Sequence, residues 1–182
     1  MTMPVSQLPL LLRYEPETGR LFWQERTPDL FADGKRSAAH ACAQWNSCHA
    51  GKEAFLKRLP NGYLVGSIFN VKYPAHRVIW ALVYGKLPEN VIDHINGDKA
   101  DNRLANLRAA TVSQNGMNRG LPANNSSGCK GVSWDRACQK WQAKIGIHGK
   151  TIYLGNFDHL EAAKAAYAAA SREVHGEFGR TQ

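Results

Sequence analysis

The residues best suited to chemistry lie between positions 93 and 118, where an aspartate and a histidine are adjacent and two asparagines follow. Asp93 and His94 form the pair, and Asn106 and Asn115 are the asparagines. A neutral imidazole can take a proton from water near pH 7, and a carboxylate beside it can hold a hard divalent cation. Phosphodiester hydrolysis needs both, because a base activates the water and a cation neutralises charge on the phosphate.

The point at which the strand ends decides whether Asp93 and His94 can act on one site. Neighbouring side chains of a strand point to opposite faces, so Asp93 and His94 reach one site only if the strand ends there. The turn-forming residues 95–97 supply that end. Taken singly, Asp, Asn and Gly also indicate an ordinary turn. The full pattern DHxNGxxxDNRxxNLRxxTxxQNxxN is much harder to obtain by chance.

The surrounding elements are expected to follow the order strand, loop, strand, helix. An apolar face at helical spacing predicts a helix within 75–88, which Gly and Pro residues end. Short strands are expected at 91–94 and 107–111, and a short helix is expected from 113 to 118. The segment therefore predicts a ββα unit.

The full pattern resembles that of the HNH nucleases, in particular the phage and intron-encoded homing endonucleases, over about residues 76–118. The resemblance implies that His94 is the general base and that Asp93 and Asn115 bind the metal. It also implies that Asn106 braces the loop and the base. Two protein ligands leave room for waters and phosphate oxygens, which suits Mg²⁺ or Mn²⁺. The implied reaction is DNA hydrolysis that leaves a 3′-hydroxyl and a 5′-phosphate.

Several polar residues near this pattern are weaker candidates. Arg103, Arg108 and Asn118 are candidate contacts to DNA phosphates, although Arg108 is equally expected as a solvated strand residue. His76 and Arg77 open the predicted helix. We expect them to be surface residues at the start of a packed helix rather than catalytic groups.

The C-terminal region has the pattern of a three-stranded antiparallel sheet followed by a helix. Strands are expected at 131–135, 140–148 and 151–157, and the middle one alternates strictly between apolar and polar residues. Asp158 and Glu161 have the spacing of a capping box at the start of the helix. The apolar sheet face should pack on this helix, which leaves the lysine-bearing face open.

This region, residues 131–178, resembles the AP2 DNA-binding domain. The matching residues are Gly131, Val132, Lys140, Trp141, Ala143, Tyr153, Leu154, Gly155, Phe157, Glu161, Ala162, Ala163, Ala166 and Tyr167. The resemblance implies a sheet face that enters the DNA major groove. The candidate DNA contacts are Trp134, Arg136, Lys140, Gln142, Lys144, Lys150 and Tyr153. Ser133, Asp135 and Thr151 stand where plant AP2 domains carry arginines, so base preference does not carry over.

The expected fold class is α+β, with a β-rich N-terminal region before the ββα-metal nuclease core and the AP2-like domain. The expected boundaries are 1–75 for the first region, 76–120 for the core, 121–128 for a linker and 129–182 for the last domain. The first region resembles the β-rich lead-in to this core in phage endonucleases.

Within residues 1–75, the pattern predicts strands but no long helix. Strands are expected at 20–25 and within 62–73, and a loop is expected at 45–52.

The charge of the chain favours a polyanionic partner. Lys and Arg number 23 against 15 Asp and Glu, so the net charge is +8, spread along the chain. Double-stranded DNA is the expected partner, with no small-molecule substrate and no membrane, since no apolar run approaches the roughly 20 residues of a bilayer span. We find no convincing signal peptide and expect a cytoplasmic protein, in the bacterial host if a phage encodes it. A monomer is expected, with a dimer as the alternative.

Two other hypotheses come from different classes. The first is a non-catalytic, sequence-specific DNA-binding regulator that uses the AP2-like domain and keeps the nuclease unit only as a scaffold. A scaffold would have no reason to retain Asp93, His94 and Asn115 together. The second is a small zinc-stabilised module built on Cys42, Cys48 and His49, which the irregular cysteine spacing disfavours.

Overall fold

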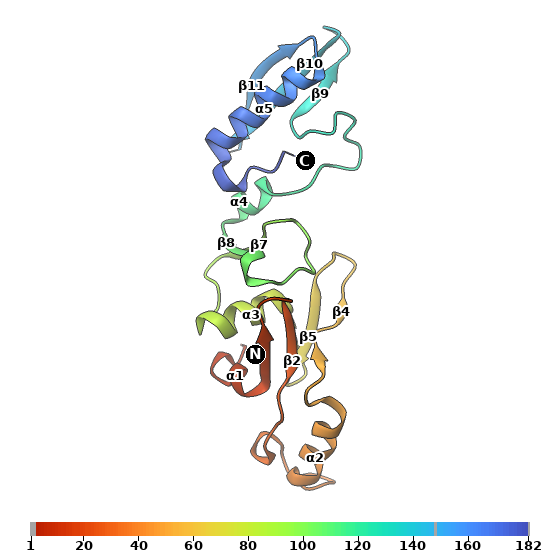
Figure 1. Ribbon diagram of the computed structural model, residues 1–182, viewed down its shortest axis with the longest axis vertical. Coiled ribbons are helices and arrows are strands. Elements are labelled where there is room, and N and C mark those ends of the chain that lie inside the picture. The colour runs from red at the N-terminus through yellow and green to blue at the C-terminus, as the bar shows by residue number, and fades with distance from the viewer. Residues whose placement is uncertain (1–2, 148, 182) are drawn as a thin grey trace. The chain divides into compact units, whose positions relative to one another are not determined.

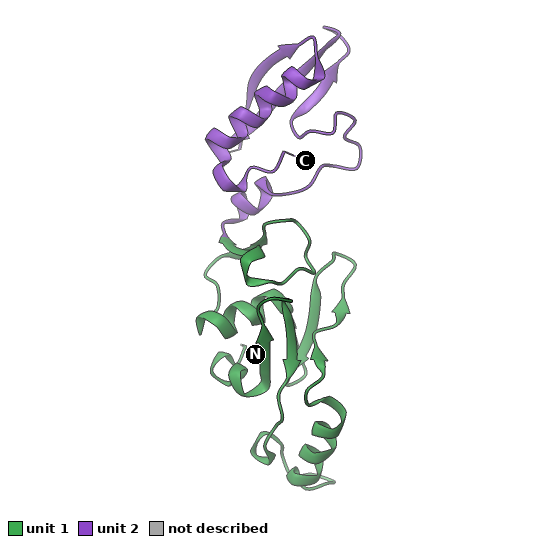
Figure 2. Cartoon of the chain, viewed as in Figure 1, with its two compact units in different colours: residues 1–109 green, residues 110–182 purple. Residues whose placement is uncertain are grey.

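The computed structural model describes residues 3–147 and 149–181. The chain divides into two compact units, unit 1 within residues 1–109 and unit 2 within residues 110–182 (Figure 2). Each unit is described by itself. No helix among the described residues combines the length and the apolar character needed to cross a membrane.

Unit 1 is built from three small sheets and three helices (Figure 1). The first sheet has the order β1-β2-β3 and joins Leu12–Glu15, Arg20–Trp23 and Glu53–Ala54. The second has the order β4-β5-β6 and joins Lys57–Arg58, Leu64–Ile68 and Val71–Pro74. The third pairs β7, Val91–His94, with β8, Leu107–Ala110. The helices are α1, Leu8–Leu11; α2, Ala38–His49; and α3, Ala75–Tyr84.

One hydrophobic core holds unit 1 together. Leu8, Leu11 and Leu21 from the N-terminal region pack in the same cluster as Val78 and Ile79 of α3. The cluster continues to β7 and β8 through Ile92 and Leu107. The expected boundary at residue 75 therefore falls inside a shared core and does not separate two packed bodies.

The predicted loop at 45–52 was wrong, because residues 38–49 form the 12-residue helix α2. Ser37 begins it as the N-cap, its side chain accepting a hydrogen bond from the His40 backbone N–H. Only Cys42 of this helix is buried, so no apolar stripe at 3–4 spacing marks it in the sequence. By contrast, α3 is confirmed, and it ends where Gly85 takes a left-handed conformation at φ 67°.

Unit 2 holds the predicted three-stranded antiparallel sheet and its helix. The strands are β9, Val132–Asp135; β10, Lys140–Ile147; and β11, Lys150–Phe157, in the order β11-β10-β9. The helix α5, Leu160–His175, lies on this sheet, with Ala143 and Ile145 packed against Ala163 and Tyr167. The short helix α4, Val112–Met117, precedes the sheet and starts with a complete capping box from Thr111 and Gln114.

Two expectations for unit 2 were wrong in detail. The residue that begins α5 is His159, which makes no side-chain capping bond, and Asp158 instead forms an ion pair with Lys140 at 3.1 Å. The expected linker 121–128 is tied into the unit. Its Ser127 is buried, and the hydroxyl donates to the Val132 carbonyl at 2.7 Å.

Candidate active site

The pair Asp93 and His94 stands at the end of β7, where the strand turns into a polar loop. Both side chains are buried, each 3% exposed. The turn closes at once, because the Gly97 N–H donates to the His94 carbonyl at 2.8 Å. The strand therefore ends at the residue where the two side chains have to address one site.

Asn106 holds the loop that follows. Its Oδ1 accepts a hydrogen bond from the Asn96 N–H at 2.9 Å, and its Nδ2 donates to the Asp101 carbonyl at 2.8 Å. The Ile95 N–H also donates to the Asn106 carbonyl at 2.9 Å. One buried side chain thus ties both ends of the loop, which is the contact pattern that a bracing role requires.

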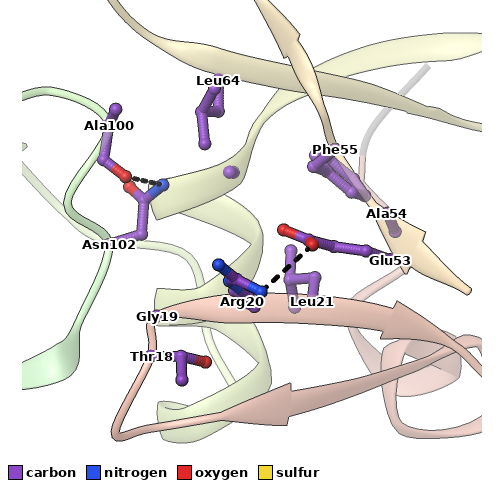
Figure 3. A pocket seen from close by; sticks show the side chains of 11 residues that line it. Thr18, Gly19, Arg20, Leu21, Glu53, Ala54, Phe55, Leu64, Ala100 and Asn102 are labelled. Atoms are coloured by element: carbon purple, nitrogen blue, oxygen red, sulfur yellow. Dashed lines mark hydrogen bonds and ion pairs between the residues drawn. The ribbon is translucent and has the colours of Figure 1, made fainter.

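The His94 ring is held by a residue that sequence reasoning passed over. His94 Nε2 lies 3.2 Å from Oδ1 of Asn102, whose side chain is 2% exposed. The Asn102 amide donates from Nδ2 to the Ala100 carbonyl at 3.3 Å, as Figure 3 shows. Because an amide oxygen only accepts, this arrangement places a proton on Nε2 and leaves Nδ1 as the basic nitrogen. Asn102 belongs to the recognised pattern, but only its contact shows what it does.

The N-terminal hairpin supports this loop from the other side. The Tyr14 hydroxyl donates to the Asn102 carbonyl at 3.0 Å. The hairpin turn comes so close that a Cβ on Gly19 would lie 2.5 Å from the Arg103 nitrogen, and φ at Gly19 is 74°. Only glycine fits there. A pocket of about 300 Å³ lies between this turn, β3 and Asn102 (Figure 3).

His76 was expected at the surface, and that expectation was wrong. Its side chain is 8% exposed, and its ring meets the His94 ring edge to face with centroids 5.2 Å apart. Tyr63 completes the cluster at 5.0 Å from the His76 ring and 5.8 Å from the His94 ring. The first turn of α3 thus reaches the catalytic candidate, a contact that the helical period could not reveal.

Burial keeps both imidazoles neutral. Together with the smaller effects of nearby His94 and Arg77, it lowers the pKa of His76 to about 3. Burial also lowers the pKa of His94, while the hydrogen bond that His94 donates to Asn102 and the charge of Asp93 oppose the shift. A neutral His94 is the form that can accept a proton.

This burial predicts an acid-sensitive unit 1. Between pH 6.5 and about 3, the unfolded chain binds a proton at His76 that the folded chain excludes. Stability is therefore complete above pH 6.5 and falls on acidification, by up to about 1.4 kcal/mol per pH unit from this group. Urea unfolding over this range should show a flatter pH dependence for His76→Phe. The exposed His40→Phe should keep the wild-type slope, and equal slopes in all three proteins would contradict the prediction.

Arg108 is paired with the carboxylate expected to bind metal. Its Nε lies 2.9 Å and its terminal nitrogen 2.8 Å from Oδ2 of Asp93, and the Arg108 side chain is 12% exposed. The expectation of a solvated strand residue was wrong. In this structure Arg108 contacts Asp93, so its suggested contact to a DNA phosphate stays a prediction.

The other two candidate phosphate contacts differ in exposure. Arg103 is exposed and forms an ion pair with Asp101 at 2.6 Å. Its hydrogen bonds lower the pKa of Asp101 to about 2. Asn118 is buried at the end of α4, which makes it a poor candidate for direct contact with DNA.

The residues around Asp93 and His94 suit a magnesium-type site better than a closed zinc site. Among the described residues, no three His, Cys, Asp or Glu side chains gather where they could hold a metal, whereas closed zinc sites use four such ligands. A magnesium-type site needs only one or two carboxylates with waters and phosphate oxygens. Buried Asp93 beside a neutral imidazole fits that type. Asn115 lies on α4 in unit 2, while Asp93 and His94 lie in unit 1.

The register of the unit 2 sheet sorts its candidate DNA contacts by face. Cross-strand partners share a face, and Trp134 pairs with Trp141, which packs on the core. Lys150 likewise pairs with Ile147, another core-packed residue. Trp134 and Lys150 therefore lie on the face that packs against α5, and their suggested contacts to DNA stay predictions.

The remaining candidate DNA contacts lie on the sheet face away from α5 or in the β9–β10 turn. Gln142 pairs with Ser133 and Lys144 with Tyr153, all on the face away from α5. Lys140 shares that face and is ion-paired with Asp158, and Arg136 is exposed in the β9–β10 turn.

Comparison with known proteins agrees with this geometry. A family model described as HNH endonuclease matches residues 73–117, which run from the end of β6 through α4. Protein 3.8 of Escherichia phage T7 is 35% identical over 106 residues, which cover 58% of this chain and 87% of that protein. The chain belongs to the HNH endonuclease family.

A second relative of this HNH protein comes from Acanthamoeba polyphaga mimivirus and is named an uncharacterized HNH endonuclease. It is 32% identical over 109 residues, which cover 59% of this chain and 56% of that protein. No solved structure matches the chain. The matched region contains Asp93, His94, Asn106 and Asn115, and also His76 and Asn102.

Proposed function

We propose that this HNH protein is a metal-dependent DNA endonuclease of the homing type, which nicks or cleaves double-stranded DNA. The observation that carries the proposal is the buried, neutral His94 at the end of β7, oriented by Asn102 and adjacent to Asp93. A base fixed in one tautomer beside a buried carboxylate is what phosphodiester hydrolysis requires.

Each residue then has a defined task. His94 takes the proton of the attacking water at Nδ1, because Nε2 is engaged with Asn102. Asp93 would hold Mg²⁺ or Mn²⁺, with Asn115 as the second ligand. When bound, the cation supplies charge stabilisation to the phosphate and the departing oxygen. Asn106 keeps the loop, and with it His94, in place.

Unit 2 is proposed as the part that selects the site. Its three-stranded antiparallel sheet and the helix α5 packed on it support this proposal. The open face presents Gln142, Lys144 and Tyr153, which can reach base edges and phosphates in a major groove. One active site per chain favours nicking by a monomer, whereas a dimer would cut both strands.

One contact favours the alternative, a non-catalytic DNA-binding regulator. Arg108 neutralises Asp93 with two short contacts to a single oxygen, as expected if the nuclease unit serves only as a scaffold. The same pair also suits an enzyme in which Arg108 holds the Asp93 carboxylate in place until a cation arrives. A measurement of DNA nicking distinguishes the enzyme from the regulator.

Incubating supercoiled plasmid with the protein and Mg²⁺ should yield open-circular DNA, and EDTA should abolish the reaction. The physical reason is that the pentavalent phosphorus carries extra negative charge, which a carboxylate such as Asp93 and a neutral amide such as Asn115 do not stabilise without a cation. Mn²⁺ should replace Mg²⁺. The regulator is supported instead if the protein nicks none of the DNA substrates tested, including DNA from a phage and its host, and still gives a salt-sensitive gel shift.

A further inference from the structure

One feature of unit 1 has no part in the proposed chemistry, namely an arginine surrounded by aromatic rings. The guanidinium carbon of Arg26 lies 3.7 Å from the centre of the Trp45 ring and 5.4 Å from that of Trp23. The Phe69 ring is 5.9 Å away. These side chains line a hollow of about 390 Å³, which we call the Arg26 hollow. It involves α2 and the β5–β6 turn, at the end of unit 1 away from β7 and β8 (Figure 1).

The backbone of Arg26 is fixed in place. The side chain of Asn46 accepts from the Arg26 N–H at 2.9 Å and donates to the Arg26 carbonyl at 2.9 Å. The Cys42 thiol donates to the same carbonyl at 3.1 Å. Helix α2 therefore holds Arg26 by three bonds, and the guanidinium is presented from a rigid base.

The guanidinium nevertheless has no anionic partner among the residues that the structure describes. Its Nε is buried without a hydrogen-bond acceptor. Burial lowers the pKa of Arg26, and no carboxylate is among the groups that act on it. An arginine that is partly buried is normally paired. The guanidinium of Arg26 has N–H donors in one plane, and their geometry matches the oxygens of a phosphate.

Phe69 adds a second, independent sign of a binding site. It occupies the first position of the two-residue turn between β5 and β6, with φ 47°, followed by Asn70 with φ 63°. Such turns favour Asn or Gly at both positions, and a phenylalanine there is strained. The Phe69 side chain is nevertheless 39% exposed. A strained, exposed aromatic ring beside an unpaired arginine points to a ligand with both a flat face and a negative charge.

We propose that the Arg26 hollow binds one nucleotide of a DNA strand, with Arg26 donating to the phosphate and Phe69 stacking on the base. A nucleotide combines the two required features, and the net charge of +8 attracts the rest of the strand. This inference rests on the proposed function, because it takes DNA to be the substrate. It gives residues 1–75 a role in holding DNA outside the region matched by the family model.

The test measures binding of the full chain in EDTA, so that no cleavage occurs. The probes are a labelled single-stranded oligonucleotide and the same strand made entirely of abasic sites. Arg26→Gln should weaken binding to both probes and reduce the slope of log affinity against log salt by about 1. Phe69→Asn should weaken binding to the base-containing strand by about 5- to 100-fold and leave the abasic strand and the salt slope unchanged.

The matched control is Arg36→Gln, which removes the same charge from an exposed position of unit 1 and should change affinity by less than about twofold. Phe69→Asn also guards against misfolding, because asparagine relieves the positive φ. If both hollow variants bind both probes like the wild type, the hollow is purely structural and the inference is overturned. Plasmid nicking tests the proposed function separately. If the wild-type protein does not nick DNA but Arg26→Gln weakens DNA binding, the proposed function fails and the Arg26 inference stands.

Discussion

Replacing His94 with alanine should lower the rate of metal-dependent nicking by about 100- to 10,000-fold, the usual contribution of a positioned general base. His94 is the buried imidazole whose Nε2 is engaged by Asn102, which fixes the orientation of its ring. The measurement is the initial rate of conversion of supercoiled plasmid to open circles at saturating Mg²⁺. Binding to the same plasmid in EDTA should change little.

The control for this variant is His40→Ala, an exposed histidine of α2 in the same unit. It should nick at the wild-type rate. Circular dichroism of both variants checks that unit 1 is folded, because the His94 ring also packs against His76 and Tyr63. A His94→Ala protein that is folded and nicks at the rate of the wild type would rule out His94 as the base.

The second large effect concerns the ion pair between Asp93 and Arg108. Asp93→Ala should lower the free energy of unfolding of unit 1 by about 3–5 kcal/mol, because it removes the carboxylate that pairs with the largely buried Arg108 guanidinium. Adding Arg108→Met should restore most of that loss, since the second change removes the charge that the carboxylate had paired. Nicking should stay absent in the double variant, because the proposed metal ligand is still missing.

Urea unfolding measures these differences. The matched control is Arg103→Met, which removes one partner of the exposed ion pair with Asp101 and should cost less than about 1 kcal/mol. Two results would contradict the argument: an Asp93→Ala protein as stable as the wild type, or a double variant less stable than the single one.

The local sequence pattern was sufficient to predict a helix or strand where the residues that decide it are neighbours in the sequence. The apolar period over 75–84 predicted α3, and the alternation over 140–147 predicted β10, and both are confirmed. It failed at α2, where only one side chain is buried and no stripe exists. The burial of His76 was also missed, because it depends on packing against the His94 ring.

The candidate site shows the same division. The pattern from Asp93 to Asn118 was enough to indicate an HNH domain, because its residues lie within one short segment whose resemblance to the family can be read from the sequence. His76 and Asn102 were not assigned from it. His76 lies 18 positions before His94, and Asn102 acts through a loop whose path depends on Tyr14 and Gly19.

The sequence by itself indicated an HNH endonuclease domain, the order of most elements and the basic charge that favours DNA. These depend on residue identity and short-range periodicity. Only the tertiary structure decided that His76 is buried against His94, that Arg108 pairs with Asp93, and that Arg26 has aromatic neighbours but no anionic partner among the described residues. Each of these is a contact between elements distant in the chain, and burial and pairing set its electrostatics.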